Sequence, residues 1–159
     1  MRGKILIVED FADWRDLLQG LLQREGHEVE AVATLQEARA YLQETTDLDL
    51  AILDIRLVET EEDNEDGMRL LAEIDAQQPF TRVIMITGHG TMEVQRRAFR
   101  SFHAFDFFRK EEFDSEEFRR AVQEAVEDAA RERQAWKDQN YIRSRRYELW
   151  QQGKSPYNP

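Results

Sequence analysis

Two hydrophobic patterns alternate along this chain. Short apolar runs bounded by polar residues are typical of strands buried on both faces of a sheet, and they alternate with stretches in which apolar residues recur at helical spacing. The runs predict strands at about 4–9, 27–32, 49–54, 82–87 and 104–108. The intervening stretches predict helices at about 11–25, 35–44, 68–78 and 91–100, and a fifth helix after Asp114.

Local signals support the predicted helix ends. Thr34 and Glu37 have the spacing of a capping box, and Asp114 is a good N-cap. Pro79 stops the third helix. After Asp114, neither Gly nor Pro interrupts the chain until Gly153, so we expect the last helix to run well past the domain.

Regular strand–helix alternation predicts an α/β fold, a doubly wound five-stranded parallel sheet with an extended C-terminal helix. Right-handed crossovers then place helices on both faces of the sheet. We expect one domain over residues 1–130, followed by a helical extension and tail over residues 131–159.

Composition narrows the class of protein. The 159 residues are 41% hydrophobic and 35% charged, which suits a soluble globular domain. No apolar run approaches the ~20 residues of a membrane span, and the N-terminus has no signal-peptide pattern. The chain has no cysteine, which excludes disulfides and thiolate metal sites. We therefore expect a cytoplasmic protein that does not enter a membrane.

The net charge of −11 is unevenly distributed. Residues 1–130 carry 15 Lys and Arg against 30 Asp and Glu, whereas residues 131–159 carry 7 against 3. An acidic body repels polyanions, which argues against nucleic acid as its partner.

Polar side chains stand at or just after the carboxyl ends of four of the predicted strands. They are Glu9 and Asp10, Asp54, Thr87 and Lys110. Ligands bind at the carboxyl ends of the strands in open parallel sheets, so we expect these groups to share one site. Clustered carboxylates stay ionised when a hard divalent cation lies among them, and Mg²⁺ fits such a site.

The same groups suit phosphoryl transfer. That reaction needs positioning and charge neutralisation, which Mg²⁺, the Thr87 hydroxyl and the Lys110 ammonium would supply. Asp54 is the best candidate nucleophile, because an aspartyl phosphate is an established covalent intermediate.

These motifs resemble the receiver domain of two-component response regulators over about residues 3–130. The matching stretches stand in the same order as in that family: Ile7-Val8-Glu9-Asp10, Ile52-Leu53-Asp54-Ile55-Arg56-Leu57, Met85-Ile86-Thr87-Gly88 and Asp106-Phe107-Phe108-Arg109-Lys110. The resemblance implies the flavodoxin-like strand order 2-1-3-4-5.

The resemblance also implies a role for each position. Asp54 would accept a phosphoryl group from a histidine kinase or phosphotransfer protein, and Lys110 and Thr87 would contact that group. Glu9, Asp10, Asp54 and the backbone carbonyl of Arg56 would hold Mg²⁺. The domain would catalyse only its own phosphorylation and dephosphorylation, without acting as an enzyme on another substrate.

Signalling would then proceed through protein–protein contacts. Phe107 would be an aromatic switch residue that turns inward when Thr87 moves toward the phosphate. Arg56 and His89 occupy positions that tune phosphate lifetime in the family. The output partner is unknown, and the face formed by the fourth helix, fifth strand and fifth helix would be remodelled.

The sequence departs from the family pattern at two positions. The family usually has a proline, in a cis bond, after the lysine; here Glu111 stands there, and we expect a trans bond. Val58 replaces another common proline, and the loop that follows is longer than usual. A pseudo-receiver that binds partners without phosphorylation is therefore the alternative function.

Two further patterns have more than one interpretation. The acidic loop 59–67 and the start of the next helix have spacings close to a calcium-binding EF-hand loop, but we favour a solvated loop. The residues of this pattern are Glu62, Asn64, Asp66, Gly67 and Glu73. The site residues could also suggest a phosphatase of the haloacid-dehalogenase type. Such an enzyme needs a second aspartate two residues after the nucleophile, and Arg56 stands there, which argues against this interpretation.

The extension mixes aromatic and basic residues, a pattern that can bind nucleic acid. We favour a homodimer through the fifth helix and the extension, a docking helix, or packing against the acidic body. The residues are Trp136, Tyr141, Ile142, Tyr147, Leu149 and Trp150, among Arg143, Arg145 and Arg146.

Overall fold

The computed structural model describes residues 2–58, 60–88 and 91–153. Glu59, His89 and the end of the tail (154–159) lie outside the described residues, as do the side chains of Ile142, Tyr147 and Trp150. The roles predicted for these groups therefore stay predictions.

One five-stranded parallel sheet forms the centre of the molecule, in the expected order β2-β1-β3-β4-β5. Its strands are β1 (Lys4–Val8), β2 (Glu28–Val32), β3 (Leu50–Leu53), β4 (Arg82–Thr87) and β5 (Asp106–Arg109). The helices are α1 (Ala12–Arg24), α2 (Leu35–Glu44), α3 (Asp66–Gln77), α4 (Met92–Phe102) and α5 (Ser115–Gln151). The predicted fold class is thus confirmed.

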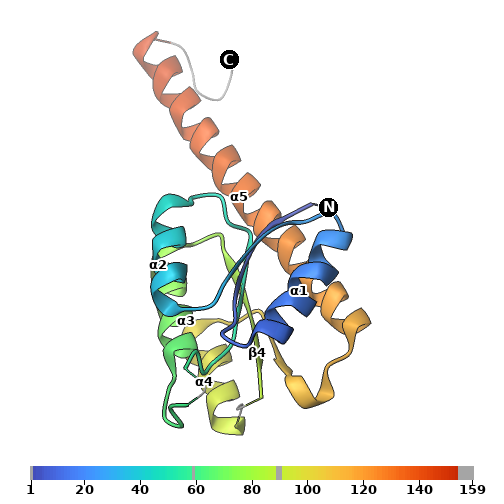
Figure 1. Cartoon of the computed structure of the whole chain (residues 1–159). Helices are drawn as coiled ribbons and strands as arrows, with labels where there is room; N and C mark the ends of the chain where they lie inside the picture. Colours follow the sequence, from blue (N-terminus) through green and yellow to red (C-terminus); the bar gives the residue numbers. More distant parts are fainter. Residues whose placement is uncertain (1, 59, 89–90, 154–159) are drawn as a thin grey trace.

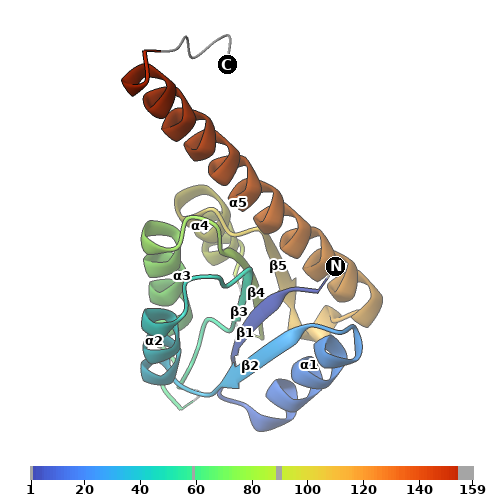
Figure 2. The same ribbon diagram turned by 90° about the horizontal axis from the view of Figure 1, so that it is seen from above.

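The helices cover both faces of the sheet, α2, α3 and α4 on one side and α1 and α5 on the other (Figures 1 and 2). Side chains alternate along a strand, so β1 contributes Leu6 and Val8 to one core, and Ile5 and Ile7 to the other. All four are fully buried. Burial on both faces explains why these strands are continuous apolar runs in the sequence.

Most helix ends lie where the sequence places them. The Thr34 hydroxyl accepts a hydrogen bond from the Glu37 amide at 3.1 Å, and the Asp114 carboxylate accepts bonds from the amides of Glu116 and Glu117. The last strand begins at Asp106, later than the predicted 104. The reason is that α4 continues to Phe102 and the Ala104 amide still closes its end by donating to Ala98.

The last helix is 37 residues long, which corresponds to about 55 Å. Its first half packs on the sheet through Phe118, Val122 and neighbouring apolar residues. The extension then packs against the acidic body as far as Trp136, whose ring centroid lies 5.9 Å from that of Phe80. Beyond that contact the helix projects away from the body (Figures 1 and 2).

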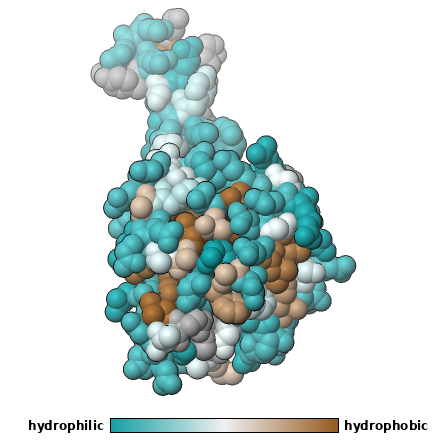
Figure 3. Space-filling view, viewed as in Figure 1, coloured by the Kyte–Doolittle hydropathy of each residue, from teal (hydrophilic) through white to brown (hydrophobic). Residues whose placement is uncertain are grey.

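The visible surface is mixed in hydropathy. On the face shown in Figure 3, hydrophobic patches are separated by hydrophilic surface, and the visible part of the projecting helix is mainly hydrophilic. Within the described residues, no helix combines the length and the apolar character needed to span a bilayer.

Candidate functional site

Strand register brings the predicted site residues together. Val8 of β1 pairs with Leu53 of β3, and the Asp54 amide donates to the Val8 carbonyl at 3.1 Å. Glu9 and Asp54 are the next residues of these two strands, so they meet at the carboxyl edge of the sheet. Thr87 is the register partner of Arg109, which places Lys110 beside the same edge.

Three carboxylates form one acidic cluster. Glu9, Asp10 and Asp54 each offer an oxygen, and these oxygens all lie within 4.8 Å of one another. Asp54 is 0% exposed and Glu9 1% exposed, whereas Asp10 is half-buried. In the described part of the chain, no other group of three acidic or histidine side chains is arranged this way.

Lys110 lies between two of these carboxylates. Its Nζ atom is 2.9 Å from Oδ2 of Asp54 and 2.9 Å from Oε2 of Glu9. Burial lowers the pKa of Lys110, but the two carboxylates outweigh that effect, so the net shift is upward. The ammonium group is therefore charged at neutral pH.

Glu9 has the most strongly altered ionisation at the site. Burial and the negative charge of Asp54 raise the pKa of Glu9 from 4.5 to about 8, although Lys110 partly offsets the shift. Glu9 also accepts a hydrogen bond from the Phe11 amide at 3.1 Å. A cation in the cluster would favour the ionised form of this carboxyl group.

The donor set fits a hard divalent cation. Among the described residues, no donor bonds to the buried Oδ1 of Asp54, and a buried acceptor without a partner is costly. Carboxylate oxygens are the ligands that Mg²⁺ prefers. The side chain of Arg56 points toward the neighbouring loop, donating to the Glu62 carbonyl at 2.9 Å, and the metal role of its own carbonyl stays a prediction.

Three residues near the site did not enter the predicted set. Gly67 opens α3 directly against the acceptor strand, where a Cβ atom would lie 1.7 Å from the Asp54 carbonyl oxygen. Arg15 donates to the Glu9 carbonyl at 3.0 Å, and the Trp14 ring faces Lys110. The sequence marks Trp14 only as an apolar helix position and Gly67 only as the end of a loop.

The acidic loop does not have the geometry of a calcium site in its described part, residues 60–67. Oδ1 of Asn64 accepts hydrogen bonds from the amides of Leu57 and Asp66. Glu73, the last residue of the EF-hand pattern, instead forms an ion pair with Arg39. These contacts favour the interpretation of the segment as a solvated loop.

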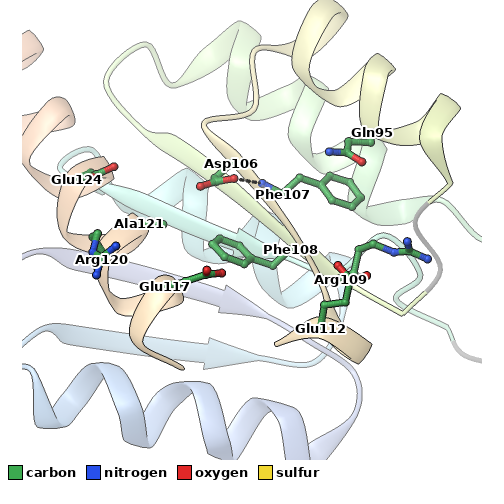
Figure 4. Close-up of a pocket in the computed structure, with 10 residues that line it drawn as sticks. All are labelled: Gln95, Asp106, Phe107, Phe108, Arg109, Glu112, Glu117, Arg120, Ala121 and Glu124. Carbon is green, nitrogen blue, oxygen red and sulfur yellow. Dashed lines mark hydrogen bonds between the residues drawn. The ribbon is translucent and has the colours of Figure 1, made fainter. Parts of the chain in front are cut away.

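Phe107 lies in the core beside α4. It is 9% exposed, and its ring centroid is 6.5 Å from that of Phe99. Figure 4 shows Phe107 and Phe108 on opposite sides of β5, at a groove of about 640 Å³ between α4, β5 and α5. The ring of Phe107 is thus already inward here, and its role as a switch stays a prediction.

A short turn follows β5 at Lys110, where Glu111 stands in place of the proline that is usual in the resembled family. Lys110–Glu112 forms a single 3-10 turn, closed by the Phe113 amide donating to the Lys110 carbonyl at 3.3 Å. The described residues contain no cis peptide bond, as expected for Glu111.

Comparisons with known proteins agree on one family. A family model described as response regulator receiver domain matches residues 5–123. The response regulator protein PilR of Pseudomonas aeruginosa is 34% identical over 109 residues, which are 69% of this chain and 23% of PilR. The chain thus spans about a quarter or less of the curated relatives that it matches.

Solved structures give the same result. NtrX from Brucella abortus, crystallised with ADP, superposes with a TM-score of 0.73 at 34% identity, covering 86% of this chain and 29% of NtrX. The beryllofluoride-activated NtrC4 receiver domain dimer superposes with a TM-score of 0.69 at 27% identity, covering 79% of this chain and 98% of that one.

Proposed function

This chain belongs to the response regulator receiver domain family, and from that premise we propose that it is a Mg²⁺-dependent phosphoacceptor whose acceptor is Asp54. The observation that carries the proposal is the position of Lys110. Its ammonium group lies 2.9 Å from both Asp54 and Glu9 in a buried acidic cluster. An ammonium group shared by two buried carboxylates at the edge of the sheet suits the binding of a charged phosphoryl group better than it suits a purely structural ion pair.

The side chains present can perform the transfer. Oδ1 of Asp54 has unused lone pairs and would attack the phosphorus of a phosphohistidine, so that the phosphorus–nitrogen bond breaks and the electron pair returns to the imidazole. Lys110 and Thr87 would pair with phosphoryl oxygens. Bound Mg²⁺ would neutralise the charge of the carboxylates and the incoming group.

The donor would be a histidine kinase or a phosphotransfer protein. The chain itself would catalyse only the gain and loss of its own phosphoryl group, and would not turn over a separate substrate. Because Asp54 is buried, the donor would have to present its phosphoryl group at the edge of the sheet.

Phosphorylation would be transmitted to the face formed by α4, β5 and α5. Thr87 would move toward the phosphoryl group, and Phe107, whose ring already lies inward beside Phe99, would be held there, shifting a two-state equilibrium. The groove between these elements and the projecting half of α5 would then present a changed surface to an output partner or to a second copy of the chain.

The test is phosphorylation by a small donor. Incubation with Mg²⁺ and acetyl phosphate should add the mass of one phosphoryl group, and the addition should be lost in Asp54→Asn and after chelation of Mg²⁺. Asp47→Asn is the matched control, because Asp47 is an exposed carboxylate paired with Lys4 outside the cluster. It should be phosphorylated like the unaltered chain.

Absence of any mass increase in the folded, unaltered chain would contradict the proposal. The alternative, a pseudo-receiver that binds its partner without phosphorylation, would then be the better description. Equal labelling of Asp54→Asn and the unaltered chain would show instead that another residue is the acceptor.

A further inference from the structure

The ammonium group of Lys110 has a defined position that the local backbone alone does not explain. A lysine carries its charge on a flexible four-carbon stem. Here that stem starts from a single 3-10 turn at the end of the edge strand β5. Even so, the Nζ atom lies between two buried carboxylates, and the side chain is only 13% exposed.

An aromatic ring lies against the charged end of this side chain. Nζ of Lys110 is 5.3 Å from the ring centroid of Trp14, on α1. This is within the distance of about 6 Å at which a cation is attracted to an aromatic face, and tryptophan gives the strongest such attraction. The ammonium group therefore has an aromatic neighbour in addition to its two carboxylate partners.

Trp14 is in turn fixed by the residues that follow Lys110. The ring of Phe113 meets that of Trp14 edge to face, with centroids 5.3 Å apart at 88°. Phe113 lies 5.4 Å from Phe118, which is fully buried in the core between α5 and the sheet. These contacts tie the lysine turn both to α1 and to the core.

We propose that Trp14 is a positioning residue for Lys110, which holds the ammonium group beside Asp54 and so accelerates phosphorylation of that residue. The inference deepens the proposed function and rests on it. When a phosphoryl group arrives, Lys110 must leave a carboxylate and pair with a phosphoryl oxygen. An aromatic face attracts the cation without a directional hydrogen bond, so it can retain the ammonium group during that exchange.

The first experiment measures the rate of phosphorylation by acetyl phosphate in the full chain. Trp14→Leu keeps an apolar side chain but removes the ring, and it should lower the rate constant about 3- to 30-fold. Trp14→Phe keeps an aromatic face and should restore most of the loss. Trp136→Phe, far from the site, is the control for replacing a tryptophan and should have no effect.

A double-mutant cycle distinguishes positioning from general packing. If Trp14 acts through Lys110, then Trp14→Leu should change the rate little in a chain that already carries Lys110→Ala. Equal losses in both backgrounds would overturn the proposal, as would an unchanged rate in folded Trp14→Leu. If Trp14→Leu does not fold, fluorinated tryptophan at this position weakens cation binding with little change in shape, and the rate should fall with increasing fluorination.

A spectroscopic readout separates this inference from the proposed function. The chain has 3 tryptophans, so replacing Trp136 and Trp150 by phenylalanine leaves Trp14 as the only one. Its emission should differ between that protein and its Lys110→Ala variant, whether or not Asp54 is phosphorylated. Identical emission would overturn the positioning role, whereas failure of the unaltered chain to accept phosphate would refute only the proposed function.

Discussion

Glu9 illustrates how burial changes the chemistry of a single residue. The carboxyl group is 1% exposed and faces the charge of Asp54, and its pKa is raised to about 8. Without a cation, Glu9 therefore retains its proton to a higher pH than an ordinary carboxyl group. Binding of a cation must displace that proton, so metal affinity and pH are linked.

We expect Mg²⁺ affinity to rise with pH until Glu9 is fully ionised, so affinity should be weaker at about pH 6 than at about pH 9. The metal-free protein should show the opposite trend in stability. The pKa of Glu9 is higher in the folded state than in the unfolded state. The contribution of Glu9 to stability is therefore fully present below pH 4.5 and is lost as the pH rises through about 8. Calorimetric Mg²⁺ titrations and thermal unfolding at both pH values measure these effects.

Glu9→Gln is the control for this prediction. The amide keeps the shape and the acceptor oxygen but cannot ionise, so both pH dependences should be much weaker. Equal Mg²⁺ affinity for the unaltered chain at the two pH values would show that Glu9 is not the group that competes with the metal.

Residues outside the strand ends show the limit of a local interpretation. The carboxylates, Thr87 and Lys110 follow apolar strands and could be grouped from the sequence alone. Gly67 could not, because the requirement for a residue without a side chain arises only from the close approach of α3 to the Asp54 carbonyl. Trp14 likewise has the helical spacing of a core residue, and only the packing of α1 beside the Lys110 turn shows its second contact.

Helix α5 continues beyond the five-stranded domain into the extension. Arg133 and Trp136 of the extension contact the body. Arg133 forms an ion pair with Asp49 at 2.7 Å and donates to the Leu48 carbonyl, and Trp136 packs on Phe80. Asp49 is 9% exposed and also accepts the Lys4 amide at 2.8 Å, so this carboxylate joins the extension to the start of β1.

We expect Arg133→Gln to destabilise the protein by about 1–3 kcal/mol, because a largely buried carboxylate loses its charged partner. Hydrogen exchange in the segment after residue 130 should also accelerate. Chemical denaturation and exchange measured by mass spectrometry test both effects. Arg131→Gln is the matched control, since Arg131 is exposed and its ion pair with Asp128 is worth little.

If Arg133→Gln and Arg131→Gln change stability equally, the contact with Asp49 does not fix the extension.

The C-terminal end of α4 has a backbone conformation that the sequence does not predict. The helix ends at His103, a non-glycine residue with a φ of 58°, whose ring lies 3.1 Å from Asp75 on α3. Side-chain contact with a neighbouring helix, which no local pattern reveals, accompanies this left-handed end.

At the scale of the whole molecule, charge is divided between an acidic body and a basic extension. The body carries 30 acidic against 15 basic residues, and the extension 3 against 7. Tyr141 on the projecting helix is 69% exposed. Exposed aromatic side chains among basic residues are typical of protein–protein interfaces, and an acidic body is a complementary partner.

We expect activation to favour a dimer that uses α5. Beryllofluoride with Mg²⁺ should raise the molar mass measured by light scattering, because the activated face and the extension together would form the interface that we expect. Asp54→Asn should not respond. Tyr141→Ser should weaken the dimer about tenfold by removing an aromatic contact, whereas Gln139→Ser, another exposed position on the extension, should not. A monomer under all conditions would contradict a role for the extension in dimerisation.

The sequence by itself determined the alternation of strands and helices, the long last helix and the residues at the strand ends. Those features follow from hydrophobic periodicity and helix caps, which act over a few residues, and from the rule that parallel strands end at one edge. Only the tertiary structure decided the contacts between distant segments, such as Trp14 with Lys110, Gly67 with Asp54 and Arg133 with Asp49. The physical reason is that such contacts depend on how whole elements pack, and no local pattern encodes the distance between them.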